Sequence, residues 1–201
     1  MGPRDVARRA AGSTWTHGLA VSGSSASDVW IFGHVGKGVA SVSHYDGAVW
    51  TPAAVPAIDA ALSAAIYVAS PTEAWIAHGM SILKWDGSAW SIAHSAATEL
   101  LDIAGSSESD VWAVGRDGLA VHWDGTSWSE TTTGVAITLT QVASAGPTRA
   151  WAAGGRGGTI LEWNGTAWTP KVGLSRESIS VLTYADKLWG MTSGGGIFYA
   201  R

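Results

Sequence analysis

The chain has 201 residues, a net charge of −4 at pH 7, only 14% charged residues, 26 Gly, 13 Trp and no Cys. Nucleic-acid-binding domains usually carry a basic stripe, so this charge balance argues against a nucleic-acid partner. The lack of cysteine excludes disulfides, thiolate metal sites and cysteine nucleophiles, and the lack of an apolar run of about 18 residues argues against membrane insertion.

The first residues, 1–13, carry charge but are not followed by the apolar segment of an export signal. The cellular compartment is therefore open. One interpretation is a secreted or cell-surface protein whose leader has been removed, and another is an excised part of a longer protein.

Two tryptophan motifs then recur along the chain. The first places a polar residue and a small apolar residue before Trp, and its spacings are 45, 37, 39 and 38 residues. Its members end at Trp30, Trp75, Trp112, Trp151 and Trp189. A recurrence of about 40 residues is typical of a repeat architecture.

The second motif is an aromatic residue, Asp-Gly or Asn-Gly, two small residues and Trp. "WDGTSW" ending at Trp128 is one example. In the four complete copies the opening aromatic residues are Tyr45, Trp85, Trp123 and Trp163, and the closing tryptophans are Trp50, Trp90, Trp128 and Trp168. The two chain ends would supply the fifth copy, with Tyr199 as its opening residue and Trp15 as its closing one. Together the two motifs account for all 13 tryptophans.

Each repeat is expected to form four short strands. In the third repeat these are 100–105, 110–115, 118–123 and 127–131, because β-rich runs there are bounded by Gly and Asp-Gly. "GRDG" at 115–118 predicts one hairpin and Asp124-Gly125 another. Asp-Gly is a favoured central pair of a type I′ turn, since both positions need a positive φ.

Four strands per period of about 40 residues predict a five-bladed β-propeller, all-β, with four antiparallel strands per blade. We expect a single domain, residues 1–201, and a monomer. The predicted repeat units are 17–50, 51–90, 91–128, 129–168, and 169–201 together with 1–16.

Pairing of the N- and C-terminal segments in one blade would close the ring, with Trp15 in the outer strand beside residues 196–201. The interval from Trp15 to Trp30 is only 15 residues, against 21 to 25 elsewhere. Three alternatives stay open: a short outer strand, Trp15 in the next inner strand with residues 4–12 closing the ring, or a fragment that closes differently or assembles with copies of itself.

"VGRDGLAVHWDGTSW" and "GGRGGTILEWNGTAW" resemble Asp-box (BNR-type) propeller repeats. They are also similar to the repeats of photosystem II assembly and stability factors and of Trp-rich exported bacterial proteins, especially myxobacterial ones. The resemblance covers nearly the whole chain and implies the fold. It implies no single function, because sialidases, receptors, assembly factors and lectins share the repeat.

The recurring residues favour structural roles. The first Trp column is expected to wedge between sheets, and Asp46, Asp86, Asp124 and Asn164 are expected to stabilise turns, so we predict no metal site and no cofactor. The closing tryptophans have a second interpretation as aromatic platforms for sugar rings. These candidate platforms are Trp50, Trp90, Trp128 and Trp168.

Positions that differ between repeats are better candidates for ligand binding, because the fold alone does not dictate them. They lie in the hairpins between second and third strands and in the links between blades, which share one face of a propeller. The predicted rim site consists of His34, Lys37, His78, Arg116, Asp117, Arg156 and Arg176. The links add His17, Asp59, His94, Glu99 and Glu177.

No motif for a catalytic nucleophile, paired carboxylates or phosphate binding is present, so we predict no catalytic residues. The preferred function is a non-catalytic module that binds a glycan, with a protein-interaction scaffold as the alternative and a small enzyme using the rim as a less favoured third. The Ala-rich link 51–67 predicts a short helix or lid, or a longer outer strand.

Overall fold

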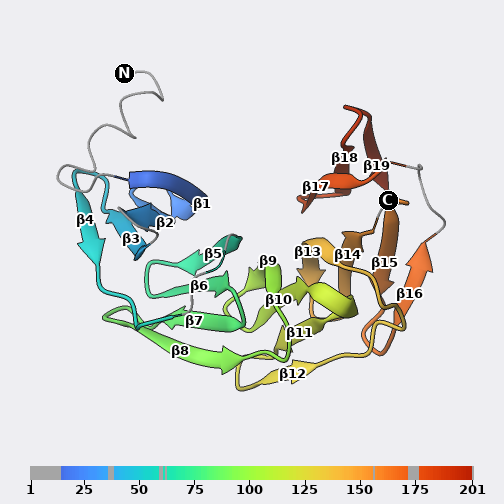
Figure 1. Cartoon of the computed structure of the whole chain (residues 1–201), viewed down its shortest axis with the longest axis horizontal. Coiled ribbons are helices and arrows are strands. Elements are labelled where there is room, and N and C mark those ends of the chain that lie inside the picture. Colours follow the sequence, from blue (N-terminus) through green and yellow to red (C-terminus); the bar gives the residue numbers. More distant parts are fainter. Residues whose placement is uncertain are drawn as a thin grey trace. The chain divides into compact units, whose positions relative to one another are not determined.

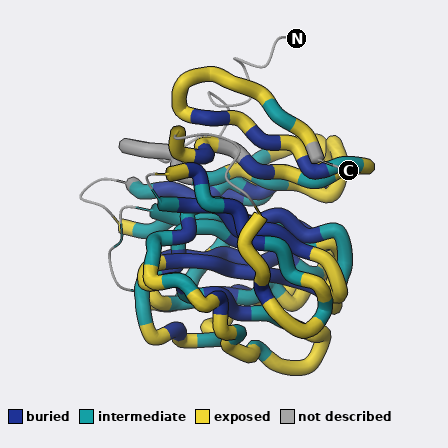
Figure 2. The backbone as a smooth tube through the Cα atoms, turned by 90° about the vertical axis from the view of Figure 1, so that its right-hand side faces the viewer, coloured by how far each residue is buried: buried dark blue, intermediate teal, exposed yellow. Residues whose placement is uncertain are grey.

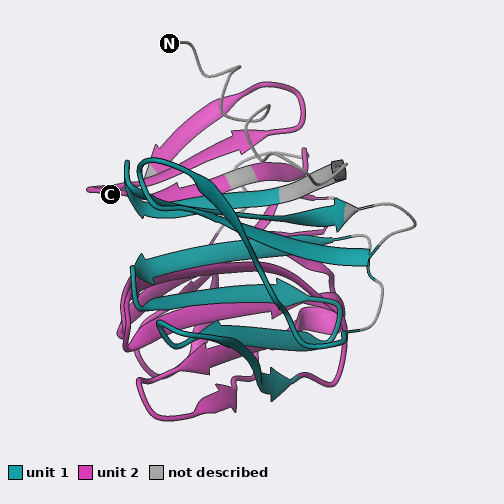
Figure 3. Ribbon diagram, turned by 90° about the vertical axis from the view of Figure 1, so that its left-hand side faces the viewer, with its two compact units in different colours: residues 1–95 teal, residues 96–201 magenta. Residues whose placement is uncertain are grey.

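The computed structural model describes residues 15–35, 39–58, 61, 63–155, 157–171 and 177–200. The chain divides into two compact units, residues 1–95 (unit 1) and residues 96–201 (unit 2), which Figure 3 shows in different colours. Each unit is built from small antiparallel sheets that follow one another along the chain.

Unit 1 contains two four-stranded sheets (Figure 1). In both sheets the hydrogen-bonded order is the order of the chain. The first sheet is β1 (Trp15–Ser25), β2 (Asp28–Val35), β3 (Val39–Tyr45) and β4 (Trp50–Ala53). The second is β5 (Ala64–Ser70), β6 (Glu73–His78), β7 (Ser81–Trp85) and β8 (Trp90–Ser95).

Unit 2 contains two four-stranded sheets and one three-stranded sheet. The third sheet of the chain is β9 (Leu100–Ser107), β10 (Asp110–Gly115), β11 (Ala120–Trp123) and β12 (Trp128–Glu130), with a single 3₁₀ turn, η1 (Arg116–Gly118). The fourth is β13 (Leu139–Gly146), β14 (Arg149–Gly154), β15 (Thr159–Trp163) and β16 (Trp168–Lys171). The last is β17 (Ile179–Tyr184), β18 (Leu188–Thr192) and β19 (Ile197–Ala200). The described residues include no helix long and apolar enough to cross a membrane.

These sheets confirm the predicted all-β, five-bladed propeller class. The four strands expected in the third repeat are all present, and the predicted "GRDG" hairpin is the turn η1 between β10 and β11. Four of the five blades have four described strands, and the last has three.

The first Trp column forms the wedges that the sequence predicts, except in the last blade. Trp30, Trp75, Trp112 and Trp151 are at most 3% exposed. Within unit 1, Trp30 packs in a core with Ile66 and Ile76 of the next sheet, and the same arrangement recurs between the sheets of unit 2. Figure 2 shows the buried strands that make these cores.

The last blade leaves the corresponding face open. Trp189 pairs with Tyr199 and Met191 pairs with Ile197, so the four side chains share one face of the sheet. Their exposed fractions range from 39% for Trp189 to 74% for Ile197. Tyr199 therefore does not occupy the opening column of the second motif as predicted. The hairpin between β18 and β19 sets a register that places Ala200 there, opposite Leu188.

Trp15 begins β1, whose partner is β2, and lies opposite Val35. The structure thus selects the alternative in which Trp15 belongs to an inner strand, which also explains its short interval to Trp30. Residues 1–14 lie outside the described residues, so ring closure and the single-domain boundaries stay predictions.

The predicted type I′ geometry of the Asp-Gly turns is wrong, although their stabilising role is confirmed. Among the described non-glycine residues only Asp117 has a positive φ, whereas Gly125 has φ +94°. Asp124 instead accepts hydrogen bonds at Oδ1 from the backbone N–H groups of Thr126 (2.8 Å) and Ser127 (2.9 Å). Asn164 makes the equivalent bonds with its amide oxygen, so the turn does not require a charge.

The link 51–67 forms neither the helix nor the long outer strand considered above in its described part. Strand β4 ends at Ala53 and β5 begins at Ala64. Residues 54–58 have no regular secondary structure, and residues 59, 60 and 62 lie outside the described residues.

Candidate functional site

The described residues include four of the seven predicted rim residues. Lys37, Arg156 and Arg176 lie outside the described residues, as does Asp59 of the links. His34 and His78 belong to unit 1, and Arg116 and Asp117 belong to unit 2.

In unit 1 the ends of β2 and β6 bring His34 and His78 together, with ring centroids 5.7 Å apart. His78 is only 1% exposed, packs 4.9 Å from Phe32, and places Nδ1 3.1 Å from the carbonyl oxygen of Ser63. The predicted proximity is therefore present, but the imidazole of His78 lies beneath the surface.

In unit 2, Arg116 and Asp117 border a hollow of about 530 Å³. Three segments border it: the turn η1, the link before β9, and the end of β12 with the link after it. Its lining comprises Ala97, Thr98, Arg116, Asp117, Gly118, Leu119, Glu130, Thr131, Thr132, Thr133, Gly134, Val135 and Ala136. We call this feature the hollow.

Hydrogen bonds between the turn and the following link preform the hollow. Gly118 donates its N–H to the carbonyl oxygen of Ile137 (2.7 Å), and Thr133 donates its hydroxyl to the carbonyl oxygen of Gly118 (2.7 Å). Gly118 has φ +74°, and a Cβ there would lie 1.9 Å from the carbonyl oxygen of Val135. Only glycine fits where the turn and the link approach each other this closely.

The charged groups that border the hollow differ in whether they already have a partner in the chain. Arg116 Nε lies 2.6 Å from Glu99 Oε2, so that cation is already paired. The carboxylates of Asp117 and Glu130 are exposed and have no hydrogen-bond or ion-pair partner among the described residues. A carboxylate accepts hydrogen bonds only, so these two groups are suited to ligand hydroxyls.

The closing tryptophans differ in accessibility. Trp90 and Trp168 are 5% and 6% exposed, and each packs edge-on against the wedge tryptophan of the preceding sheet. Their ring faces are therefore not available as platforms. Trp50 and Trp128 are half-buried and stay candidates.

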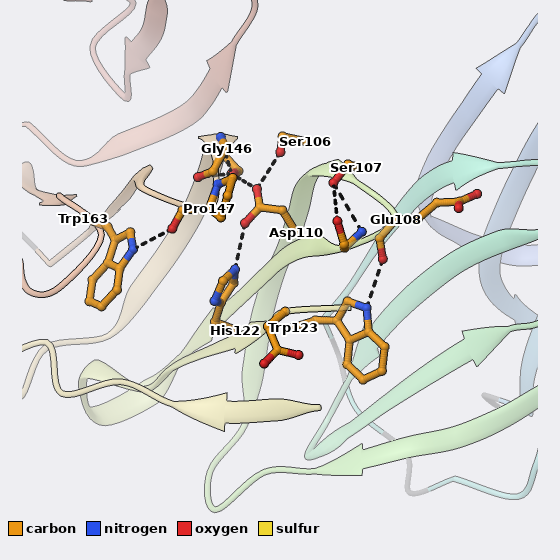
Figure 4. A network of polar contacts seen from close by, with 12 residues as sticks. Ser106, Ser107, Glu108, Asp110, His122, Trp123, Gly146, Pro147 and Trp163 are labelled. Atoms are coloured by element: carbon orange, nitrogen blue, oxygen red, sulfur yellow. Dashed lines mark hydrogen bonds and ion pairs between the residues drawn. The ribbon is translucent and has the colours of Figure 1, made fainter. Parts of the chain in front are cut away.

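The carboxylate of Asp110 lies at the centre of a polar network that was not predicted from the sequence (Figure 4). The carboxylate is buried, lies 2.7 Å from Nε2 of His122, and accepts hydroxyl hydrogen bonds from Ser106 (2.6 Å) and Ser144 (2.5 Å). Burial raises the pKa of Asp110, but the hydrogen bonds led by that of His122 outweigh it and leave the pKa below 3.8.

Equivalent cross-strand pairs flank other wedge tryptophans. His122 stacks on Trp112 with centroids 4.1 Å apart, and His44 pairs with Asp28 beside Trp30 in the same way. The other described pairs at these positions are Glu73 with Lys84 and Arg149 with Glu162. A polar pair recurs beside each of these tryptophans although the residue types change, which indicates a structural role for the pairs.

Asp102 on β9 is a partly buried carboxylate that accepts backbone hydrogen bonds from Ile103 (3.0 Å) and, in the next sheet, Val142 (2.8 Å). Burial is the largest effect and raises its pKa from 3.8 to about 7 despite these bonds. In the next repeat Gln141, a neutral amide, accepts from Leu182 N–H instead.

Substituting Asp102 with Asn is therefore expected to change the pH dependence of stability. Because the folded-state pKa is raised, the wild-type chain loses stability as pH rises from about 4 to about 7, and Asp102→Asn removes that loss. Three pKa units correspond to at most about 4 kcal/mol in favour of Asp102→Asn at pH 8. Urea denaturation at pH 4, 6 and 8 checks this, with Asp117→Asn as the exposed control; parallel pH curves for wild type and Asp102→Asn would contradict it.

The repeated antiparallel sheets with buried Trp wedges define a β-propeller, and comparisons with solved structures agree. The structure titled "YCF48 bound to D1 peptide" is 18% identical over 94% of this chain and 64% of that chain, with a TM-score of 0.67. YCF48 from Cyanidioschyzon merolae is 18% identical over 92% of this chain and 66% of that one, with a TM-score of 0.63.

SapL1 lectin in complex with alpha methyl fucoside is 13% identical over 91% of this chain and 76% of that chain, with a TM-score of 0.59. At these identities the likeness shows the fold alone. The chain spans less than two thirds of the length of both YCF48 structures, at 64% and 66%. No family model and no curated protein matches it.

Proposed function

We propose that this chain, taken as one domain of residues 1–201, is a non-catalytic binding module that recognises a glycan in the hollow. The observation that carries the proposal is the pairing of a preformed hollow with two unpaired carboxylates, Asp117 and Glu130. Sugar hydroxyls donate hydrogen bonds to carboxylates and accept them from hydroxyl or guanidinium groups. The volume of about 530 Å³ lies within the usual range of ligand sites.

A glycan array followed by calorimetry with the best-bound glycan tests this proposal. The double variant Asp117→Asn/Glu130→Gln is expected to weaken binding at least about tenfold, because it removes two charged acceptors whose bonds are each worth about 1.5–3 kcal/mol. Glu108→Gln changes an exposed carboxylate outside the hollow and should bind like wild type. Unchanged affinity in the double variant would reject the hollow, and release of a cleaved product would favour the enzyme alternative.

A second candidate function is protein interaction through the exposed face of the last sheet. Val21 on β1 is 67% exposed, although its counterparts Ile66, Val142 and Leu182 are at most 8% exposed. The exposed apolar face of β1 in a second copy of the chain can therefore pack against the face of the last sheet that carries Trp189 and Ile197. The predicted ring closure would use these faces within one chain and keep it monomeric.

Light scattering across a concentration series separates these alternatives. Pairing between copies gives a mass that rises with concentration and returns to the monomer value in Ile197→Glu. A constant monomer mass in the wild type would reject the second candidate.

A further inference from the structure

Asn164 is the only asparagine of the chain, and Gly165 follows it in the turn between β15 and β16 (Figure 1). The corresponding turns of the first three repeats carry Asp46, Asp86 and Asp124 before glycine. Asn164 is exposed. The fourth turn therefore presents an asparagine amide to solvent at a position where the other repeats have a carboxylate.

Three hydrogen-bond donors meet on one oxygen of this amide. Asn164 Oδ1 accepts bonds from the backbone N–H of Thr166 (3.0 Å), the hydroxyl of Thr166 (2.9 Å) and the backbone N–H of Ala167 (2.9 Å). Neither Nδ2 of Asn164 nor the backbone N–H of Gly165 makes a hydrogen bond to a described residue. The turn thus polarises the amide and leaves both its nitrogen and the next backbone nitrogen available for reaction.

The same set of donors stabilises negative charge in the third repeat. Asp124 Oδ1 accepts from the hydroxyl of Thr126 (2.7 Å) and from the backbone N–H groups of Thr126 and Ser127. These bonds, led by that of the Thr126 hydroxyl, lower the pKa of Asp124 from 3.8 to about 2. Donors placed where negative charge develops accelerate a reaction. The donors on Asn164 Oδ1 are therefore arranged to stabilise the oxyanion that forms when a nucleophile attacks Cγ.

We propose that Asn164 is a self-modification site, at which the turn promotes deamidation of its own asparagine. The backbone nitrogen of Gly165 loses its proton to solvent and forms a bond to Cγ of Asn164, and the negative charge passes to Oδ1. The Cγ–Nδ2 bond then breaks, Nδ2 takes up a proton from solvent, and ammonia leaves behind a succinimide ring. Water opens this ring and leaves a carboxylate in place of the amide.

The residues around Asn164 suit both the reaction and its product. Gly165 has no Cβ to obstruct the closing ring. The aspartate product keeps the turn, because equivalent bonds already hold Asp46, Asp86 and Asp124 in the other repeats. Isoaspartate, the other product of ring opening, adds a carbon to the backbone and breaks this geometry. The aspartate form is therefore expected to fold like the unmodified chain with one more negative charge.

The chain offers a matched comparison for the hydroxyl donor. The first repeat has Ala48 at the position of Thr166. Among the described residues, Asp46 Oδ1 therefore accepts only the backbone bonds of Ala48 (2.9 Å) and Val49 (2.8 Å). An asparagine at position 46 would have two donors on its oxygen, whereas an asparagine at position 124 would have three.

The test moves the single asparagine between these turns. In an Asn164→Asp background, Asp124→Asn and Asp46→Asn are each incubated folded at pH 8, and mass spectrometry follows the conversion of amide to acid. Asparagine at position 124 should convert at the wild-type rate of Asn164. Asparagine at position 46 should convert about fivefold more slowly, because a hydrogen bond to a charged oxygen is stronger than one to a neutral oxygen. Adding Ala48→Thr to Asp46→Asn should restore the rate.

Two controls complete the experiment. Peptide mapping locates the converted residue and separates aspartate from isoaspartate, and far-UV circular dichroism verifies that each variant is folded. Equal rates at positions 46 and 124 would overturn the proposal. It would also be overturned if the wild-type chain converted faster when unfolded in urea than when folded, because the turn would then protect its asparagine. Neither outcome affects the proposed glycan site, since Asn164 does not border the hollow.

Discussion

Replacing Trp112 with alanine is expected to lower the free energy of unfolding by about 3–5 kcal/mol, the usual cost of truncating a buried aromatic side chain. Trp112 is fully buried in a core that joins two sheets of unit 2. Trp189 is the matched control, since it occupies the same motif position in the last blade but is 39% exposed. Trp189→Ala should cost only about 1 kcal/mol.

Urea denaturation followed by far-UV circular dichroism measures both variants without relying on tryptophan fluorescence. Equal losses of stability would contradict the wedge role assigned to the first Trp column. A large loss for Trp189→Ala alone would indicate that the last blade carries a core of its own beneath that side chain.

The second large effect is expected for Asp110→Ala, which removes the shared partner of Ser106, His122 and Ser144. Asp110 and Ser144 are buried and His122 is half-buried, so leaving these groups unpaired should cost about 2–5 kcal/mol at pH 7. Asp110→Asn keeps an acceptor oxygen and should cost less.

The pH dependence of stability isolates the contribution of the Asp110 charge. The pKa of Asp110 is lowered in the folded state, so its contribution is fully present above the unfolded value of 3.8 and is lost as pH falls through the lower folded value. The stability gap between wild type and Asp110→Asn should therefore narrow below about pH 4. A gap that stays constant down to the acid transition would show that the carboxylate charge adds nothing.

Local chemistry explains why much of the fold could be predicted from the sequence. The first Trp column occurs in all five repeats and Asp-Gly or Asn-Gly in the first four, because a wedge between sheets and a tight turn are needs that act within about 40 residues. Register was harder to predict. Tyr199 resembles an opening aromatic residue in the one-dimensional pattern, but the pairing set by the last hairpin moves it opposite Trp189.

The site was only half predictable for the same reason. Arg116 and Asp117 were identified because "GRDG" breaks the repetition. Glu130 and the threonines after it border the hollow only because hydrogen bonds hold the link after β12 against the turn η1. The run of three threonines at 131–133 was the available signal.

The most direct test of glycan recognition at the hollow is a backbone amide NMR titration of the wild-type chain with the best-bound array glycan. We predict saturable shifts concentrated at Arg116, Asp117 and Gly118 and at residues 130–136. Saturable shifts confined to other segments, with these amides unmoved, would contradict the account.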